Sequence, residues 1–112
     1  MSAENSTEPR GRVTTVAVLG AGSWGTALTM QLARAGSLPV LWDWDAAHME
    51  ALRLGRCNEK FLPGHRLPDA LVLEPDLELA VRAADEILIV VPSHAFVSVI
   101  KQIGPWLEPG QG

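Results

Sequence analysis

Cysteine and tyrosine are almost missing from this chain, which has a single cysteine, Cys57, and no tyrosine among 112 residues. One cysteine cannot form a disulfide within the chain, which fits a reducing compartment. No apolar run approaches the roughly 20 residues that a membrane-spanning helix needs. Because residues 1–12 also lack the apolar core of a signal peptide, the default expectation is a cytoplasmic location with no membrane partner.

Basic clusters are missing as well, and the formal net charge is -4. This balance argues against nucleic acid as a partner. No spacing of His, Cys and acidic residues suggests a metal site. The chain is 47% hydrophobic and 20% charged, as in ordinary globular proteins, and its 112 residues suffice for one domain. Residues 1–12 are polar and are interpreted as a disordered leader or an expression remnant before a domain over residues 13–112.

The most informative stretch is VTTVAVLGAGSWG, residues 13–25, an apolar run that ends in Gly20, Gly22 and Gly25. A helical pattern over Thr26–Ala35 follows it. Strand, glycine turn and helix in this order are typical of a dinucleotide-binding βαβ unit, in which the middle glycine lets a pyrophosphate approach the backbone. The alternative is a strand–helix turn whose glycines only permit close packing.

Strands and helices alternate along the rest of the chain. This alternation predicts an α/β, Rossmann-like fold with a parallel sheet, helices on both faces and strand order 3-2-1-4, incomplete at about four strands. The ligand crevice then lies beyond the carboxyl ends of the first and fourth strands. Asp45, Asp76 and Ser93 are expected to cap helices. The expected strands are 13–19, 38–42, 70–73 and 86–91, the helices 26–35, 46–54, 77–84 and 94–103, and the loops 55–69 and 104–112.

Asp43 lies 18 residues after Gly25, at the end of the second expected strand. This spacing suits a carboxylate that accepts hydrogen bonds from the adenosine ribose. A carboxylate there repels a 2′-phosphate, and no Arg or Lys follows within several residues, so NAD is favoured over NADP. The alternative is that Asp43 or Asp45 only caps the next helix; we assign the cap to Asp45 and the ribose to Asp43.

Three tryptophans and three histidines need an assignment. Trp24 either covers the pyrophosphate or fills space near the glycines, Trp44 is placed near the adenine, and Trp42 is assigned to the core. His94 falls at the crevice but has no visible partner for general-base chemistry, so it is interpreted as an exposed helix residue. The two other histidines, His48 and His65, are expected at the surface.

The string GAGSWGTAL at residues 20–28 resembles the N-terminal signature of NAD(P)-dependent glycerol-3-phosphate dehydrogenase. The resemblance continues through LW at 41–42, Asn58, FLPG at 61–64, LP at 67–68 and VPS at 91–93, and covers almost all of residues 13–103. These strings at these spacings are far more specific than the glycine pattern alone.

The resemblance implies hydride transfer between sn-glycerol 3-phosphate and dihydroxyacetone phosphate. Ser23 and Trp24 match positions that contact the dinucleotide, and Ala95 and Phe96 lie near a position that approaches the cofactor just after Pro92. Trp44 replaces a basic residue that bacterial members usually carry, which agrees with NAD as the cofactor.

The family's substrate-contacting lysine and its helical catalytic domain would follow Gly112. No catalytic residue is therefore assigned, and the chain is expected to be the dinucleotide-binding portion of the enzyme, inactive alone. Three alternatives stay open: a related reductase, a stand-alone dinucleotide-binding module, and a non-functional gene fragment. Because the fourth strand would lack its outer neighbour, self-association through that sheet edge is also expected.

Overall fold

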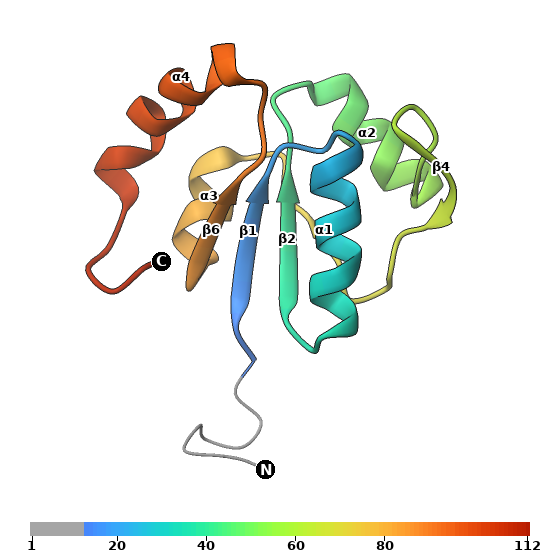
Figure 1. Cartoon of the computed structure of the whole chain (residues 1–112), viewed down its shortest axis with the longest axis horizontal. Coiled ribbons are helices and arrows are strands. Elements are labelled where there is room, and N and C mark those ends of the chain that lie inside the picture. Colours follow the sequence, from blue (N-terminus) through green and yellow to red (C-terminus); the bar gives the residue numbers. More distant parts are fainter. Residues whose placement is uncertain (1–12) are drawn as a thin grey trace.

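The computed structural model describes residues 13–112, so the expected leader over residues 1–12 lies outside the described part. The four strands of the main sheet alternate with helices along the chain, as expected (Figure 1). In chain order the elements are β1 (Thr15–Leu19), α1 (Ser23–Arg34), β2 (Leu38–Trp42), α2 (Ala46–Gly55), β3 (Cys57–Asn58), β4 (Leu62–Arg66), β5 (Val72–Leu73), α3 (Leu77–Ala83), β6 (Glu86–Ile89), α4 (Ser93–Ile103) and the 3-10 turn η1 (Gly104–Trp106).

The main sheet has four strands in the order β5-β2-β1-β6, and every pairing in it is parallel. Leu19 at the end of β1 lies opposite Trp42 of β2 and Ile89 of β6, so these three strands end at one level. Counted along the chain, this is the predicted 3-2-1-4 order of a Rossmann-like sheet. The prediction of fold class and strand order is therefore confirmed.

Two apolar cores form because successive side chains of a strand point to opposite faces of the sheet. Val16 and Val18 of β1 belong to a cluster with residues of α2, and Ala17 and Leu19 belong to a cluster with residues of α3 and α4. Each face of the sheet is thus covered by helices, as Figure 1 shows. Strands buried on both faces explain the near-continuous apolar runs in the sequence.

Helix α1 begins earlier than expected. Gly22 is its N-cap residue, and the amide of Thr26 donates to the carbonyl of Gly22 at 3.0 Å, so Ser23 already belongs to the first turn. The prediction of a helix start at Thr26 was wrong by one turn. As a consequence, Trp24 projects from the first helical turn instead of standing within the glycine turn.

The stretch 55–69, expected to be a loop, contains an antiparallel hairpin of β3 and β4. Its pattern escaped the sequence analysis because β3 has only two residues and β4 carries a proline and a glycine. The hairpin lies beside α2 and the start of α1 in Figure 1. This placement brings its residues close to the glycine turn.

Two expected caps are present and one is not. The carboxylates of Asp45 and Asp76 accept hydrogen bonds from the amides of His48 and Leu79. Ser93 was wrongly expected to cap α4: it is the first helical residue, and Pro92 precedes it with an extended backbone and no capping side chain. The reason is local, since a proline at the cap position fixes φ but offers no side-chain acceptor.

The last residues of the chain return to the edge of the sheet. The amide of Ile87 donates to the carbonyl of Gly112 at 2.8 Å, and the amide of Gly112 donates to the carbonyl of Asp85 at 3.1 Å. The start of β6 therefore has a partner on its outer side, although β6 is the edge strand of the sheet.

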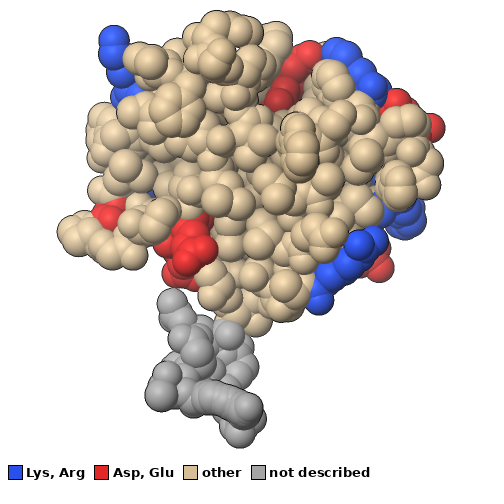
Figure 2. Space-filling model, viewed as in Figure 1, with Lys and Arg blue, Asp and Glu red and all other residues tan. Residues whose placement is uncertain are grey.

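The surface seen in Figure 2 carries its charged side chains mainly around the rim, with uncharged residues over the middle. Within residues 13–112, none of the helices combines the length and the apolar character that crossing a bilayer would require.

Candidate functional site

A cavity of about 200 Å³ lies where β1, β2 and β6 end, between the glycine turn, the end of β2 and the hairpin. This is the end of a doubly wound sheet at which ligands bind. Five of the residues predicted for the site line the cavity: Gly20, Gly22, Asp43, Trp44 and Pro92. Six further residues complete the lining: Asp45, His48, Lys60, Phe61, Val90 and Val91.

Gly20 and Gly25 are required by the fold itself. Gly20 has φ +128°, and a Cβ built on it would lie under 3.0 Å from the backbone carbonyl of Val90. A Cβ on Gly25 would likewise lie under 3.0 Å from the carbonyl of Gly20, which is why α1 can begin directly against the turn. Both glycines therefore serve close packing.

Gly22 differs from both neighbours. Its backbone has φ -79°, and a Cβ built on it would meet no heavy atom within 4 Å. The fold therefore does not need a glycine at this position. The missing side chain instead leaves open space above the backbone, beside a cavity that the same residue lines.

The N-terminus of α1 is prepared for an anion. Gly22 provides no side-chain cap, and the first turn contains no acidic residue. The first amides of a helix have no partner within the helix, and the helix dipole places partial positive charge there. Such an end favours a phosphate in front of it.

Asp43 is tied to the glycine turn. Its carboxylate accepts a hydrogen bond from the amide of Ala21 at 2.8 Å and another from the amide of Asp45 at 3.1 Å. A carboxylate offers about four acceptor positions, so positions remain for a ligand hydroxyl. Asp45 caps α2, as the division of roles between the two aspartates predicted.

Two buried side chains that the sequence analysis did not place at the site, His48 and Asn58, form hydrogen bonds to the glycine turn. The imidazole of His48 lies 3.0 Å from the carbonyl oxygen of Ala21, and the amide of Asn58 donates to that oxygen at 2.9 Å. His48 was expected at the surface, but only 8% of it is exposed. The correction has a physical reason: helix α2 turns this residue inward, beneath the glycine turn.

The hairpin adds further contacts at the cavity. The hydroxyl of Ser23 donates to the carbonyl of Phe61 at 2.6 Å, and the rings of Phe61 and His48 meet edge to face at 5.3 Å. The ammonium group of Lys60 lies 5.1 Å from the centre of the Phe61 ring. Lys60 and Asp43 both line the cavity, so Lys60 brings a positive charge close to the carboxylate. The sequence analysis considered only cations within a few residues of Asp43 and therefore missed Lys60.

Of the three tryptophans assigned from the sequence, one is a core residue and two are exposed. Trp42 is buried, as expected, and its indole N–H donates to the carbonyl of Pro75 at 3.2 Å. Trp24 and Trp44 are 77% and 73% exposed. Only Trp44 lines the cavity.

The segment after β6 contributes three lining residues, Val90, Val91 and Pro92. Ala95 and Phe96 follow in the first turn of α4, where the amide of Ala95 donates to the carbonyl of Pro92 at 2.8 Å. Phe96 is 45% exposed. His94 is exposed, as predicted. Ala95 and Phe96 lie outside the cavity lining.

The thiol of Cys57 is not activated. It donates to the carboxylate of Glu59 at 3.2 Å and to the carbonyl of His65 at 3.1 Å. The hydrogen bond to Glu59 is the main reason that the pKa of Cys57 is raised. A raised pKa disfavours the thiolate, which is the nucleophilic form.

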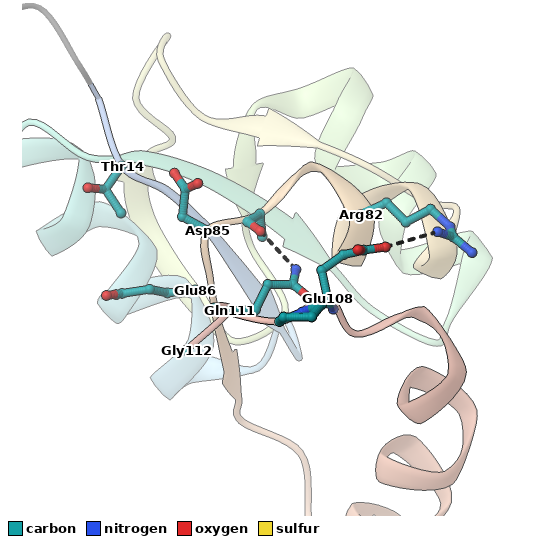
Figure 3. A pocket seen from close by; sticks show the side chains of 10 residues that line it. Thr14, Arg82, Asp85, Glu86, Glu108, Gln111 and Gly112 are labelled. Carbon is teal, nitrogen blue, oxygen red and sulfur yellow. Dashed lines mark hydrogen bonds and ion pairs between the residues drawn. The ribbon is translucent and has the colours of Figure 1, made fainter.

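A larger cavity, of about 480 Å³, lies at the opposite end of the sheet (Figure 3). Thr14 precedes β1 and Glu86 begins β6, so this cavity faces the amino ends of the strands. The carboxamide of Gln111 donates to the carbonyls of Val81 and Ala84, which holds the C-terminal residues across it. Because ligands of such sheets bind at the carboxyl ends, the smaller cavity is the candidate site.

The family model described as the N-terminus of NAD-dependent glycerol-3-phosphate dehydrogenase matches residues 15–112. The chain is 52% identical, over 97 residues, to the glycerol-3-phosphate dehydrogenase (NAD(P)+) of Edwardsiella ictaluri. The aligned region covers 87% of this chain and 29% of that protein. The corresponding protein of Vibrio cholerae is 46% identical over 108 residues, or 96% of this chain and 31% of that protein.

Solved structures agree with the sequence comparison. The crystal structure of glycerol-3-phosphate dehydrogenase from Coxiella burnetii matches with a TM-score of 0.85 and 37% identity, over 88% of this chain and 30% of that chain. The chain thus spans roughly three tenths of the length of the relatives that it matches. It belongs to the family of the N-terminal domain of NAD-dependent glycerol-3-phosphate dehydrogenase.

Proposed function

We propose that residues 13–112 form one dinucleotide-binding domain and that its cavity at the glycine turn holds the pyrophosphate of NAD. The main observation in support is that position 22 is a glycine, although the fold has open space for a side chain there. A pyrophosphate placed there would lie against the uncapped start of α1. Family membership supports the same ligand.

The proposed contacts involve residues that line the cavity and residues beside it that were predicted from the sequence. Gly20, Gly22 and Gly25 shape the phosphate site, with Ser23 and Trp24 in the adjoining first turn of α1. Asp43 and Trp44, which line the cavity beyond β2, would meet the adenosine ribose and the adenine. Pro92, Ala95 and Phe96 follow β6 and would face the nicotinamide half of the dinucleotide.

Asp43 supports NAD in preference to NADP. Its carboxylate stays beside the glycine turn through the amide of Ala21. A 2′-phosphate on the ribose would bring like charges together, which disfavours binding. Lys60 in the same cavity partly offsets that repulsion, so we propose a preference for NAD and not an exclusion of NADP.

The relatives are named glycerol-3-phosphate dehydrogenase (NAD(P)+). The reaction proposed for the whole protein is the one that the sequence resemblance implies, hydride transfer between sn-glycerol 3-phosphate and dihydroxyacetone phosphate. When bound, the nicotinamide would supply or accept the hydride. The role proposed for the 112-residue chain is to bind and orient the dinucleotide, without turnover on its own.

A thermal-shift titration tests this function. We expect NADH to raise the melting temperature of the 112-residue chain more than NADPH does at equal concentration. Parallel assays with NADH and dihydroxyacetone phosphate should show no turnover. A melting temperature that neither dinucleotide changes would refute the proposal that the chain binds a dinucleotide. Turnover by this chain would refute the proposal that it does not catalyse the reaction alone.

Self-association through the outer edge of β6 is a further proposal. Helix α4 follows this edge strand in the chain, and Phe96, Val97 and Ile100 are exposed on it. Exposed edges beside apolar side chains favour pairing between copies. Sedimentation velocity over a concentration series should show a rising mean mass, and Ile100→Lys should reduce it. A single monomeric species at every concentration would contradict the proposal.

A further inference from the structure

The peptide groups of Ala21 are held from both sides, in the middle of the glycine turn. Its amide donates to the carboxylate of Asp43, and its carbonyl oxygen receives Asn58 at 2.9 Å and His48 at 3.0 Å. A carbonyl oxygen can only accept, so Nε2 of His48 must carry the hydrogen. Side chains from three separate segments therefore fix one peptide position of the turn.

Asn58 links three parts of the molecule. It is fully buried, and its amide nitrogen donates both to Ala21 and to the hydroxyl of Thr26, the latter at 2.7 Å. Its carboxamide oxygen accepts from the amide of Phe61 at 3.2 Å. The two donors and one acceptor fix the orientation of the carboxamide. The hairpin, the glycine turn and helix α1 are thus joined through one side chain.

The glycine turn needs restraint from hydrogen bonds to residues outside it. Gly20 and Gly22 flank Ala21, and glycine has more backbone freedom than any other residue. No atom lies close to the position that a Cβ of Gly22 would take, so packing does not restrain that side of the turn, whereas Ala21 is buried and Gly20 packs against Val90. A turn that is already ordered loses less conformational freedom when a ligand binds.

We propose that His48 and Asn58 are positioning residues that set dinucleotide affinity by holding the Ala21 carbonyl, and that the β3–β4 hairpin is part of the binding apparatus for this reason. The inference rests on the proposed function. It assigns His48 an effect through Ala21, although His48 is also one of the residues that line the cavity. It also gives the hairpin a role in binding. Packing alone does not account for the hairpin, because most residues of β4 are exposed.

The test compares His48→Leu, which removes the donor, with His48→Gln, which keeps an N–H donor at the end of a side chain of similar length. NADH dissociation constants are measured on the full chain by fluorescence titration, at a temperature at which circular dichroism shows each variant folded. We expect His48→Leu to raise the dissociation constant roughly three- to tenfold, the effect of one hydrogen bond, and His48→Gln to restore most of the affinity.

Two further variants separate positioning from stability. Leu52→Met alters a buried residue one turn along α2, at a stability loss of the same order as one hydrogen bond, and should leave NADH affinity unchanged. Asn58→Leu removes the second donor and should weaken binding like His48→Leu. If Asn58→Leu does not fold, the two His48 variants decide the question alone.

Amide hydrogen exchange of the free protein provides a readout that a general loss of stability would not reproduce. In His48→Leu, exchange should accelerate in the peptide over residues 20–26 while peptides of β1 and β2 keep the wild-type rates. Unchanged NADH affinity in His48→Leu, failure of His48→Gln to restore it, or uniformly accelerated exchange would overturn the inference. Wild-type protein that does not bind NADH would overturn the proposed function together with it.

Discussion

Replacing Gly22 by alanine separates binding from folding more cleanly than any other change at the site. The backbone of Gly22, at φ -79° and ψ -164°, is extended and open to alanine, and the added methyl group meets no atom within 4 Å. Loss of freedom in the unfolded chain stabilises the variant by about 0.4–1 kcal/mol. Alanine is a poorer N-cap than glycine, which offsets a similar amount. We therefore expect the free energy of unfolding to change by less than about 1 kcal/mol.

Binding should respond very differently, because the methyl group occupies the space proposed for the pyrophosphate. At NADH concentrations ten times the dissociation constant, wild-type protein gains about 1.4 kcal/mol from the ligand. For a domain of this size, that corresponds to a rise in melting temperature of roughly 6–11 °C. In Gly22→Ala the rise should disappear, while the melting temperature without ligand stays close to the wild-type value.

The assay is differential scanning fluorimetry with and without NADH, and Gly25→Ala serves as the matched comparison. A Cβ at Gly25 would collide with the carbonyl of Gly20, so this variant should unfold at a lower temperature even without ligand. If Gly22→Ala retains the full NADH shift, the pyrophosphate does not approach this backbone. If Gly22→Ala itself lowers the melting temperature as much as Gly25→Ala, the glycine is structural.

Three further predictions concern charges around the turn and the hairpin. Asp43→Asn removes the negative charge but keeps an acceptor for the amide of Ala21, so the ratio of NADPH to NADH dissociation constants should fall; an unchanged ratio would exclude Asp43 as the discriminating group. Lys60→Ala removes the lysine charge from the cavity lining and should weaken NADPH more than NADH in the same titrations; equal loss for both would show that Lys60 does not meet a 2′-phosphate. Because the hydrogen bond to Glu59 raises the pKa of the Cys57 thiol, Glu59→Gln should lower that pKa and speed alkylation by iodoacetamide at pH 8, with no change in rate counting against the assigned bond.

The sheet and the phosphate turn were predictable because their signals are local in sequence. The apolar run before Gly20, the glycine spacing and the aspartate before α2 each determine structure within a few residues of themselves. The strand order followed from the alternation of strands and helices and from general rules of chain connection. These features needed no knowledge of distant contacts.

The remainder of the site depends on contacts between distant segments. Asn58, His48 and Lys60 reach the glycine turn only because the hairpin and α2 pack beside it, and no short pattern in their own surroundings reports that. His48 occupies an inward-facing position on the same helix as the buried Met49 and Leu52, yet a histidine is a residue that sequence reasoning places at the surface by default. Ser93 shows the opposite error, since a good capping residue was displaced by the proline in front of it.

The hydrogen bonds that hold Ala21 also have a consequence for the order in which the chain folds. The strand pair β1–β2 joins residues 23 positions apart, such as Thr15 and Leu38, whereas the bond from Asn58 to Ala21 spans 37 positions of the chain. Closing that contact requires the hairpin to have formed and docked, which costs chain entropy before it yields any stabilisation. The glycine turn should therefore acquire its final shape late, after the barrier-crossing nucleus has assembled. Variants of Asn58 would accordingly accelerate unfolding and leave the folding rate nearly unchanged.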